Sequence, residues 1–208
     1  MRLAALGIVL LLLGFLLGAW DYAESSYATQ AGWVESQPVP FSHQHHVSDD
    51  GIDCRYCHSS VEEGPYAGLP STHTCMTCHS QIWTGALPLA PVRQSEQTGE
   101  PIRWRRVAQL PDYVHFDHSI HIDRGVGCVE CHGRVDQMPL TFRAVPLQME
   151  FCLDCHRDPA ARLRPPEMVT RMEPLRWTQE QAREFGQRVL TRQHINPSSL
   201  DDCGICHR

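Results

Sequence analysis

The sequence Cys54-Arg55-Tyr56-Cys57-His58 is the first of five Cys-x-x-Cys-His motifs that decide how this chain folds. We number them motifs 1 to 5 in chain order. The cysteine pairs are Cys54 and Cys57, Cys75 and Cys78, Cys128 and Cys131, Cys152 and Cys155, and Cys203 and Cys206. The motif histidines are His58, His79, His132, His156 and His207. The motifs use all ten cysteines of the protein, so none is left for another purpose.

The spacing within each motif is typical of haem attachment. Two thiols three positions apart on a helical turn can each add to one vinyl group of a haem. The histidine that follows then lies under the ring as the proximal iron ligand. The sequence therefore predicts five covalently bound haem c groups, each with its motif histidine on the iron.

Three other interpretations of paired cysteines fit less well. The spacings between motifs 1 and 2 and between motifs 3 and 4 suit a zinc ribbon. However, zinc needs no histidine after each pair, and five pairs do not divide into groups of four cysteines. A disulfide framework does not require a strict Cys-x-x-Cys step. A thioredoxin-like redox pair normally occurs once, near a strand–helix pattern.

The composition predicts a mainly α protein with little regular structure, wrapped around five haems. Aromatic residues make up 8% of the chain, and glycine and proline number 14 and 15, so the chain alone would bury a thin core. Haem rings are large apolar surfaces that can replace core side chains, and we expect the fold to be lost without them. The formal charge is −6 and no basic face is evident, so nucleic acid is not expected as a partner.

Residues 3–20 form an uncharged apolar run near the N-terminus. As a helix this run spans about 27 Å, close to a bilayer core of about 30 Å, and Trp20 and Tyr22 follow at an interface-like position. We expect residues 1–22 to anchor the protein in the cytoplasmic (inner) membrane. The haem domain would then lie on the periplasmic (extracytoplasmic) face, where covalent haem attachment takes place. A cleaved signal peptide is the alternative.

A polar linker at 23–40 leads to a repeat of two units, at 41–82 and 114–160, each with two motifs. Both units begin with Phe-x-His-x-x-His, in which the first residue is Phe41 or Phe116. Histidines three apart lie on one face of a helical turn, so two neighbouring irons can each take one. We therefore predict four distal iron ligands, which are His43, His46, His118 and His121.

The fifth iron has three candidate distal ligands. His194 stands nine positions before motif 5. Met149 and Met138 are alternatives, and a thioether at this position would raise the potential of the haem. Each methionine also fits a gap-filling role against a haem face. His45 and His115 lie next to predicted ligands and could replace them in a shifted register.

The remaining segments carry weaker signals. Residues 83–113 form a proline-containing connection with no clear periodicity. The C-terminal segment at 161–208 follows a Pro165-Pro166 break and ends in motif 5. Within it, Thr178-Gln179-Glu180-Gln181 is typical of a capping box and predicts a helix that continues to about Arg192.

Closed haems suit electron transfer, because an iron with two protein ligands cannot bind substrate and changes oxidation state with little rearrangement. Catalysis needs an open iron beside basic and acidic groups. Four predicted distal ligands for five motifs leave at most one open site, and no catalytic constellation surrounds it. We therefore expect an electron-transfer protein with no catalytic residues of its own.

The Phe-x-His-x-x-His units resemble those of the small multihaem cytochromes of the c3/c7 class. The chain resembles more closely the pentahaem cytochrome subunits of alternative complex III, and the N-terminal anchor agrees. The stretches that carry this resemblance are Phe41-Ser42-His43, Gly51-Ile52-Asp53 with motif 1, Thr74 to Trp83 around motif 2, His118 to His121, Met138-Pro139-Leu140, and motif 4 with Arg157.

The resemblance implies the electron-transfer subunit of a membrane quinol:electron-acceptor oxidoreductase. It implies as partners an iron–sulfur subunit, a monohaem cytochrome c subunit and polytopic quinol-binding membrane subunits, with a terminal oxidase or soluble electron carrier as acceptor. It also implies mostly bis-histidine haems, with room for one methionine ligand. The alternative is a membrane-anchored cytochrome that passes quinol electrons to a periplasmic reductase such as a nitrite reductase.

Overall fold

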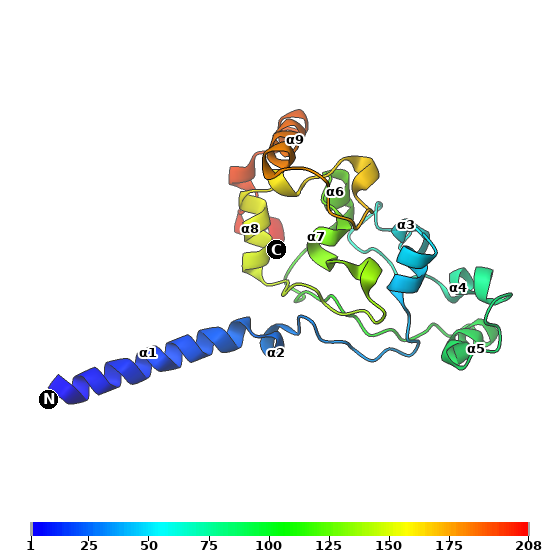
Figure 1. The fold of residues 1–208 in the computed structure, drawn as a ribbon, viewed down its shortest axis with the longest axis horizontal. Coiled ribbons are helices and arrows are strands. Elements are labelled where there is room, and N and C mark those ends of the chain that lie inside the picture. The colour runs from blue at the N-terminus through cyan, green and yellow to red at the C-terminus, as the bar shows by residue number, and fades with distance from the viewer. Residues whose placement is uncertain (1, 208) are drawn as a thin grey trace.

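The computed structural model describes residues 2–207, which form short helices joined by long loops (Figure 1). The α-helices are α1 Arg2–Glu24, α2 Ser26–Thr29, α3 Cys54–Cys57, α4 Thr72–His79, α5 Ala90–Thr98, α6 His118–Asp123, α7 Cys128–His132, α8 Met149–Arg157, α9 Gln179–Arg192 and α10 Cys203–Cys206. The other turns are η1 Gln44–Asp49, which is π-helical, and the 3₁₀ turns η2 Leu87–Leu89, η3 Val135–Gln137, η4 Ala160–Arg162, η5 Pro166–Met168 and η6 Pro197–Ser199. Within residues 2–207 the only β-type pairings are two isolated bridges. The predicted mainly α fold with little regular structure is confirmed.

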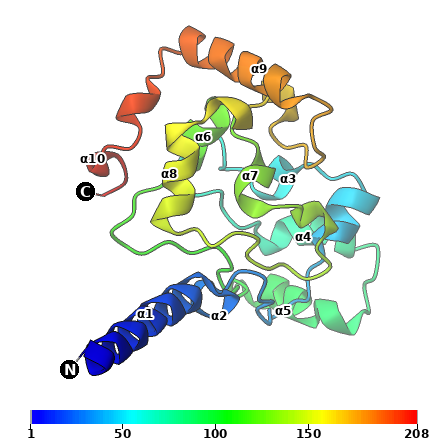
Figure 2. The ribbon, with the colours of Figure 1, turned by 60° about the vertical axis from the view of Figure 1, so that its left-hand side comes forward.

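Helix α1 carries the apolar run and projects away from the rest of the chain (Figures 1 and 2). Its 23 residues make it the one helix within 2–207 that is long and apolar enough to cross a membrane. A signal sequence has the same features, so α1 is compatible with both the predicted anchor and its alternative. At the C-terminal end of α1, the Ala23 carbonyl accepts a hydrogen bond of 3.3 Å from Gln148, just before α8.

Each motif lies on its own short helix: α3, α4, α7, α8 or α10. Polar N-cap residues fix where three of these helices begin. The side chains of Asp53, Ser71 and Asp202 accept hydrogen bonds from backbone N–H groups in the first turns of α3, α4 and α10. In every motif the two cysteines stand three positions apart on a helical turn, so their side chains lie on one face, as attachment to a single ring requires.

The core of protein side chains is thin, as the composition predicts. Its main cluster joins α9 to η4 and consists of Ala160, Leu163, Val189 and Leu190. Gly186 makes this contact possible, because a Cβ at that position would collide with the Ala160 carbonyl. This close helix contact is one of several that hold the C-terminal segment to the second unit.

One prediction of local structure was wrong. The connection at 83–113 is not irregular throughout, because it contains η2 and the nine-residue helix α5. Pro91 lies in the first turn of α5, where a missing N–H costs no helical hydrogen bond. Gly99 ends the helix in a left-handed conformation with φ 74°. Prolines at such positions mark a helix start, whereas the sequence was interpreted only as a proline-containing connection.

Two other helical predictions can be compared with the structure. The turn that follows His43 is π-helical in the first unit, whereas α6 in the second unit is α-helical. The helix predicted from the capping box is present as α9, with both reciprocal hydrogen bonds of Thr178 and Gln181 formed.

Candidate haem-binding sites

Histidines of the second unit lie in pairs whose rings are close to parallel. His118 on α6 and His132 of motif 3 have ring centroids 6.4 Å apart and an interplanar angle of 5°. His121 on α6 and His156 of motif 4 have centroids 6.1 Å apart and an angle of 25°. Two imidazoles that bind one metal ion from opposite sides, with bonds of about 2.0 Å, have centroids about 6.2 Å apart. These two pairs therefore fit an iron between each pair of rings.

The first unit has a similar arrangement. His46 and His79 of motif 2 have ring centroids 6.2 Å apart, here with an interplanar angle of 69°. Burial lowers the pKa of His43 to about 4, and the charges of His58, His46 and His132 lower it further, in that order of size. The first histidine of each Phe-x-His-x-x-His pair thus lies near the first motif of its unit, and the second histidine faces the second motif.

Eight of the nine histidines predicted as proximal or distal ligands have an oxygen atom as the hydrogen-bond partner of Nδ1; within residues 2–207, His132 has no such partner. The partner is a backbone carbonyl oxygen at 2.7–3.3 Å for His46, His58, His79, His118, His121, His156 and His207. For His43 it is the Thr141 hydroxyl at 2.8 Å. An Nδ1–H that donates to a carbonyl leaves Nε2 unprotonated and able to bind a metal. The sequence did not predict these partners, because a backbone carbonyl has no residue signature and Thr141 lies far along the chain.

Histidines outside the predicted ligand set lack this pattern. His45 has its Nδ1 3.6 Å from Asp49 and its Nε2 3.6 Å from Asp50, so both ring nitrogens face carboxylates. The exposed His73 lies 3.7 Å from a carboxylate on α5. This geometry favours His46 over His45 as the second distal ligand of the first unit.

The phenylalanine that opens each unit contacts both distal histidines in the same way. Phe41 has ring-centroid distances of 4.9 Å to His43 and 4.4 Å to His46. The corresponding distances from Phe116 are 4.7 and 4.5 Å. In both units the first contact is edge-on and the second is closer to parallel. The sequence repeat is therefore also a repeat in geometry, in which one phenyl ring spaces two ligands.

No disulfide joins any of the ten motif cysteines, so all ten are available for haem attachment. Burial raises the pKa of Cys57, Cys75, Cys152 and Cys155, and raises that of Cys131 to about 11. A hydrogen bond between Cys54 and Cys128 raises the pKa of the first thiol and lowers that of the second. Across residues 2–207, no three His, Cys, Asp or Glu side chains gather in a metal-binding arrangement.

Motif 5 lies against the start of the second unit. The Nδ1 of His207 is 3.2 Å from the Tyr113 carbonyl oxygen, and their rings are 5.9 Å apart. The His115 N–H donates to the Cys206 carbonyl at 2.8 Å. The backbone of His115 therefore contacts motif 5. Along the chain, His115 also precedes the predicted distal ligands of motifs 3 and 4.

The three distal candidates for motif 5 differ in their surroundings. Met138 is only 4% exposed, and its carbonyl accepts a hydrogen bond from the Gln44 N–H of the first unit. Met149 is 66% exposed at the start of α8. His194 is exposed after α9, with φ 55°. Within residues 2–207, no hydrogen bond joins these side chains to motif 5, so the fifth distal ligand remains a prediction among the three.

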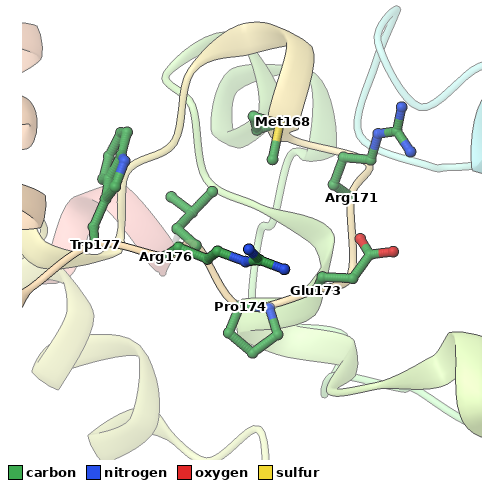
Figure 3. A pocket seen from close by; sticks show the side chains of 7 residues that line it. Met168, Arg171, Glu173, Pro174, Arg176 and Trp177 are labelled. Atoms are coloured by element: carbon green, nitrogen blue, oxygen red, sulfur yellow. The ribbon is translucent and has the colours of Figure 1, made fainter.

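A surface cleft of about 520 Å³ lies along residues 168–177 (Figure 3). Its titratable side chains are Arg171, Glu173 and Arg176, and neither a histidine nor a cysteine lines it. A catalytic haem site would combine an open iron with acid and base groups. The cleft lacks that combination, so we assign it no catalytic role.

Two protein families match this chain, on either side of the 83–113 connection. Residues 21–87 match the "Class III cytochrome C family", and residues 114–208 match "Cytochrome c7 and related cytochrome c". The chain is therefore a multihaem c-type cytochrome of the c3/c7 class, with covalently attached haem c.

One curated relative extends this classification. The "Menaquinone reductase, multiheme cytochrome c subunit" of Nitratidesulfovibrio vulgaris is 34% identical over 153 residues. The match covers 72% of this chain and 63% of the relative. This chain thus spans less than two thirds of the relative's length.

Proposed function

We propose that this protein is the electron-transfer subunit of a membrane quinol:electron-acceptor oxidoreductase of the alternative complex III type. It binds five haem c groups and relays electrons from quinol oxidation to a cytochrome c-type acceptor or an oxidase. Five motifs that use every cysteine support the haem number. The name of the relative, a menaquinone reductase subunit, supports the link to a quinone.

The chain's residues hold and tune the cofactors. When bound, haem c supplies an iron that gains or loses one electron. The ten cysteines would attach the haems, and the motif histidines would bind the irons. His43, His46, His118 and His121 would supply the second ligand at four sites. The Nδ1 hydrogen bonds fix the tautomer of each imidazole that makes one and raise its basicity, which would favour the ferric state.

The histidine pairs at 6.1–6.4 Å are the observation that carries this proposal. A site closed on both faces by imidazole excludes water and substrate from the metal. It therefore suits outer-sphere electron transfer and not catalysis at the metal. Electrons would enter and leave through partners in the same complex. These partners are an iron–sulfur subunit, a monohaem cytochrome and polytopic quinol-binding subunits.

The experiment begins with the purified membrane complex. The intact mass of this subunit should exceed that of the 23.6 kDa chain by five haems, and its spectra should be low-spin at four sites or more. Adding menaquinol should reduce these haems, and a quinol-site inhibitor should prevent the reduction. Haems that respond to dithionite but not to menaquinol would contradict the proposed quinol link.

A second candidate differs in the direction of electron flow. The relative is named a menaquinone reductase, which favours electrons that arrive from the soluble side and end on the quinone. Reduced soluble cytochrome c, or another periplasmic donor, would then drive menaquinone reduction by the complex. Comparing initial rates in both directions, with the same complex and inhibitor, separates the two candidates.

The membrane position is part of the same proposal. We propose that residues 1–22 remain as a single anchor and that the haem domain faces the periplasm. Mass spectrometry of the mature subunit should find the intact N-terminus, and the protein should resist extraction by alkaline carbonate. A mature N-terminus after residue 22 would identify a cleaved signal sequence instead.

A further inference from the structure

The order of the motifs in space differs from their order along the chain. Within each unit the order follows from the shared distal segment. His118 and His121 lie on the six-residue helix α6 and face the histidines of motifs 3 and 4. In the first unit, His46 lies three positions after His43 and faces His79 of motif 2. Motif 1 therefore neighbours motif 2, and motif 3 neighbours motif 4.

A direct contact supports the first of these pairs. The Tyr56 hydroxyl within motif 1 is 3.0 Å from the Thr77 hydroxyl within motif 2. In the second unit, Glu130 of motif 3 lies 3.9 Å from Arg162 and 3.5 Å from Arg164, on the segment that follows motif 4. Both units are thus compact pairs of sites.

The two units meet through motif 1 and motif 3. The Nδ1 of His118, the predicted distal ligand of motif 3, is 2.7 Å from the Pro65 carbonyl, shortly after motif 1. Two adjacent residues also contact both motifs. The Val169 carbonyl accepts a hydrogen bond from the Cys128 N–H of motif 3 at 3.0 Å. The Thr170 hydroxyl donates to Asp53, the N-cap of α3 in motif 1, at 2.9 Å.

Motif 2 takes no part in this junction. Within residues 2–207, no hydrogen bond or ion pair joins 72–82 to motif 3 or motif 4. The contacts of helix α4 run instead to α5, for example from the Thr72 hydroxyl to the Ser95 hydroxyl at 2.6 Å. Motif 2 is therefore at an outer edge of the series.

Motif 5 lies at the opposite end, beside motif 4. The Nδ1 of His156 in motif 4 is 2.7 Å from the Leu200 carbonyl, just before motif 5. Arg157 also lies 3.5 Å from Asp201. Both ribbon views show α4, α3, α7 and α8 in this order across the domain, and Figure 2 shows α10 and the C-terminus beyond α8 (Figures 1 and 2).

We infer that the five haem sites stand in the spatial order motif 2, motif 1, motif 3, motif 4, motif 5. Motifs 2 and 5 hold the two terminal sites, and motif 1, not motif 2, joins the first unit to the second. The inference rests on the proposed function only in that all five motifs carry haem. It is independent of the direction of electron flow and of the quinol partner.

Opening one site at a time tests this order. Loss of a distal ligand makes one ferric haem high-spin, and a high-spin iron shortens the relaxation times of the low-spin haems nearest to it. His118→Ala opens the motif 3 site and His46→Ala opens the motif 2 site in the full-length holoprotein. Haem resonances are assigned through contacts to side chains within each motif, and relaxation is measured site by site.

The inferred spatial order and the order along the chain predict different neighbours for each site. We expect His118→Ala to shorten relaxation at motifs 1 and 4 but not at motif 2, and His46→Ala to shorten it at motif 1 alone. A strong effect of either variant between motifs 2 and 3, with none between motifs 1 and 3, would overturn the inference. His45→Ala is the matched control, because it removes a neighbouring histidine and should leave every site low-spin.

A second measurement does not depend on an open site. His118→Met should keep motif 3 closed and raise its potential, so that this site is reduced first. On that first reduction step, the resonances of motifs 1 and 4 should shift more than those of motif 2. Larger shifts at motif 2 than at motif 1 would count against the inferred order. The haem number is measured separately, by mass on the unaltered protein, and it tests the proposed function.

Discussion

His118 on α6 and His132 on α7 face each other with nearly parallel rings, and their centroids are 6.4 Å apart. Burial lowers the pKa of His132 to about 4, and the neighbouring His118 and His58 lower it further, so the imidazole is neutral at physiological pH. A neutral imidazole whose Nε2 carries no proton is the form that binds a metal. Two further pairs, His121 with His156 and His46 with His79, have a similar spacing. A substitution in one pair should therefore affect one site.

Replacing a distal histidine by methionine should change one potential of five. We expect His118→Met to raise the potential of the motif 3 site and leave the others nearly unchanged, because a thioether favours the reduced iron. A potentiometric titration followed by visible absorption measures this change. His73→Met, at an exposed residue beside α5, is the control. If both variants gave the titration curve of the unaltered protein, the assignment of His118 would be wrong.

The hydroxyl of Thr141 should tune the motif 1 site through His43. It lies 2.8 Å from the Nδ1 of His43, and losing a hydrogen-bond acceptor there makes the imidazole less basic. We expect Thr141→Val to raise the potential of this site while all haems stay low-spin. Thr98→Val, on the exposed end of α5, serves as the control in the same titration. A lowered potential, or no change, would argue against ligation by His43.

Acid should destabilise the motif 1 helix through Asp53. The hydrogen bond from Arg55 is the main reason why the pKa of Asp53 is lowered to about 2. A carboxylate with a lowered folded-state pKa stabilises fully above its unfolded value, here 3.8, and that contribution is lost as the pH falls toward 2. Asp53→Asn keeps the N-cap but should flatten the pH dependence of unfolding between about pH 4 and 2.

Circular dichroism in the haem absorption band, followed from neutral to acid pH, measures this effect. Asp202→Asn changes the equivalent cap of motif 5 and is the matched comparison. A larger change in the acid transition for Asp202→Asn than for Asp53→Asn would contradict the role given to the Asp53–Arg55 pair.

The close contact between α9 and η4 should not tolerate a methyl group. Gly186→Ala places a Cβ against the Ala160 carbonyl. We expect a loss of about 1–3 kcal/mol in the free energy of unfolding from overpacking, although the same substitution in an open helix is favourable by about 1 kcal/mol. Gln187→Ala, exposed on the same helix, should stay within about 0.5 kcal/mol. Thermal unfolding of the two holoproteins provides the comparison.

Without its haems the chain should have no fixed tertiary structure. Few large apolar side chains of residues 2–207 are almost completely buried, among them Val92, Leu163 and Val169, so too little apolar surface leaves water to offset the loss of chain entropy. Expression without the haem attachment machinery should give a product with a weak near-ultraviolet dichroism signal and rapid amide exchange. A cooperative unfolding transition in this haem-free chain would contradict the idea that the rings complete the core.

Several features could be predicted from local sequence because their causes are local. The Cys-x-x-Cys-His spacing specifies the attachment chemistry, and the capping box of α9 specifies a helix start. Helix α5 was not predicted, although Pro91 in its first turn and Gly99 after its end are the two signals that mark such a helix. Thr141 was also missed, since its contact with His43 joins residues 98 positions apart.

The sequence by itself determined the positions of the thiol pairs, the histidine that follows each pair, and the repeat of two units, and from these it predicted which thiols attach a ring. These properties depend on neighbours within a few residues, where covalent geometry limits the possibilities. Only the tertiary structure decided which distal histidine faces which motif and that motif 1 lies beside motif 3. Those relationships arise from long loops that pack against one another, for example Pro65 against His118, and no local pattern specifies how such loops meet.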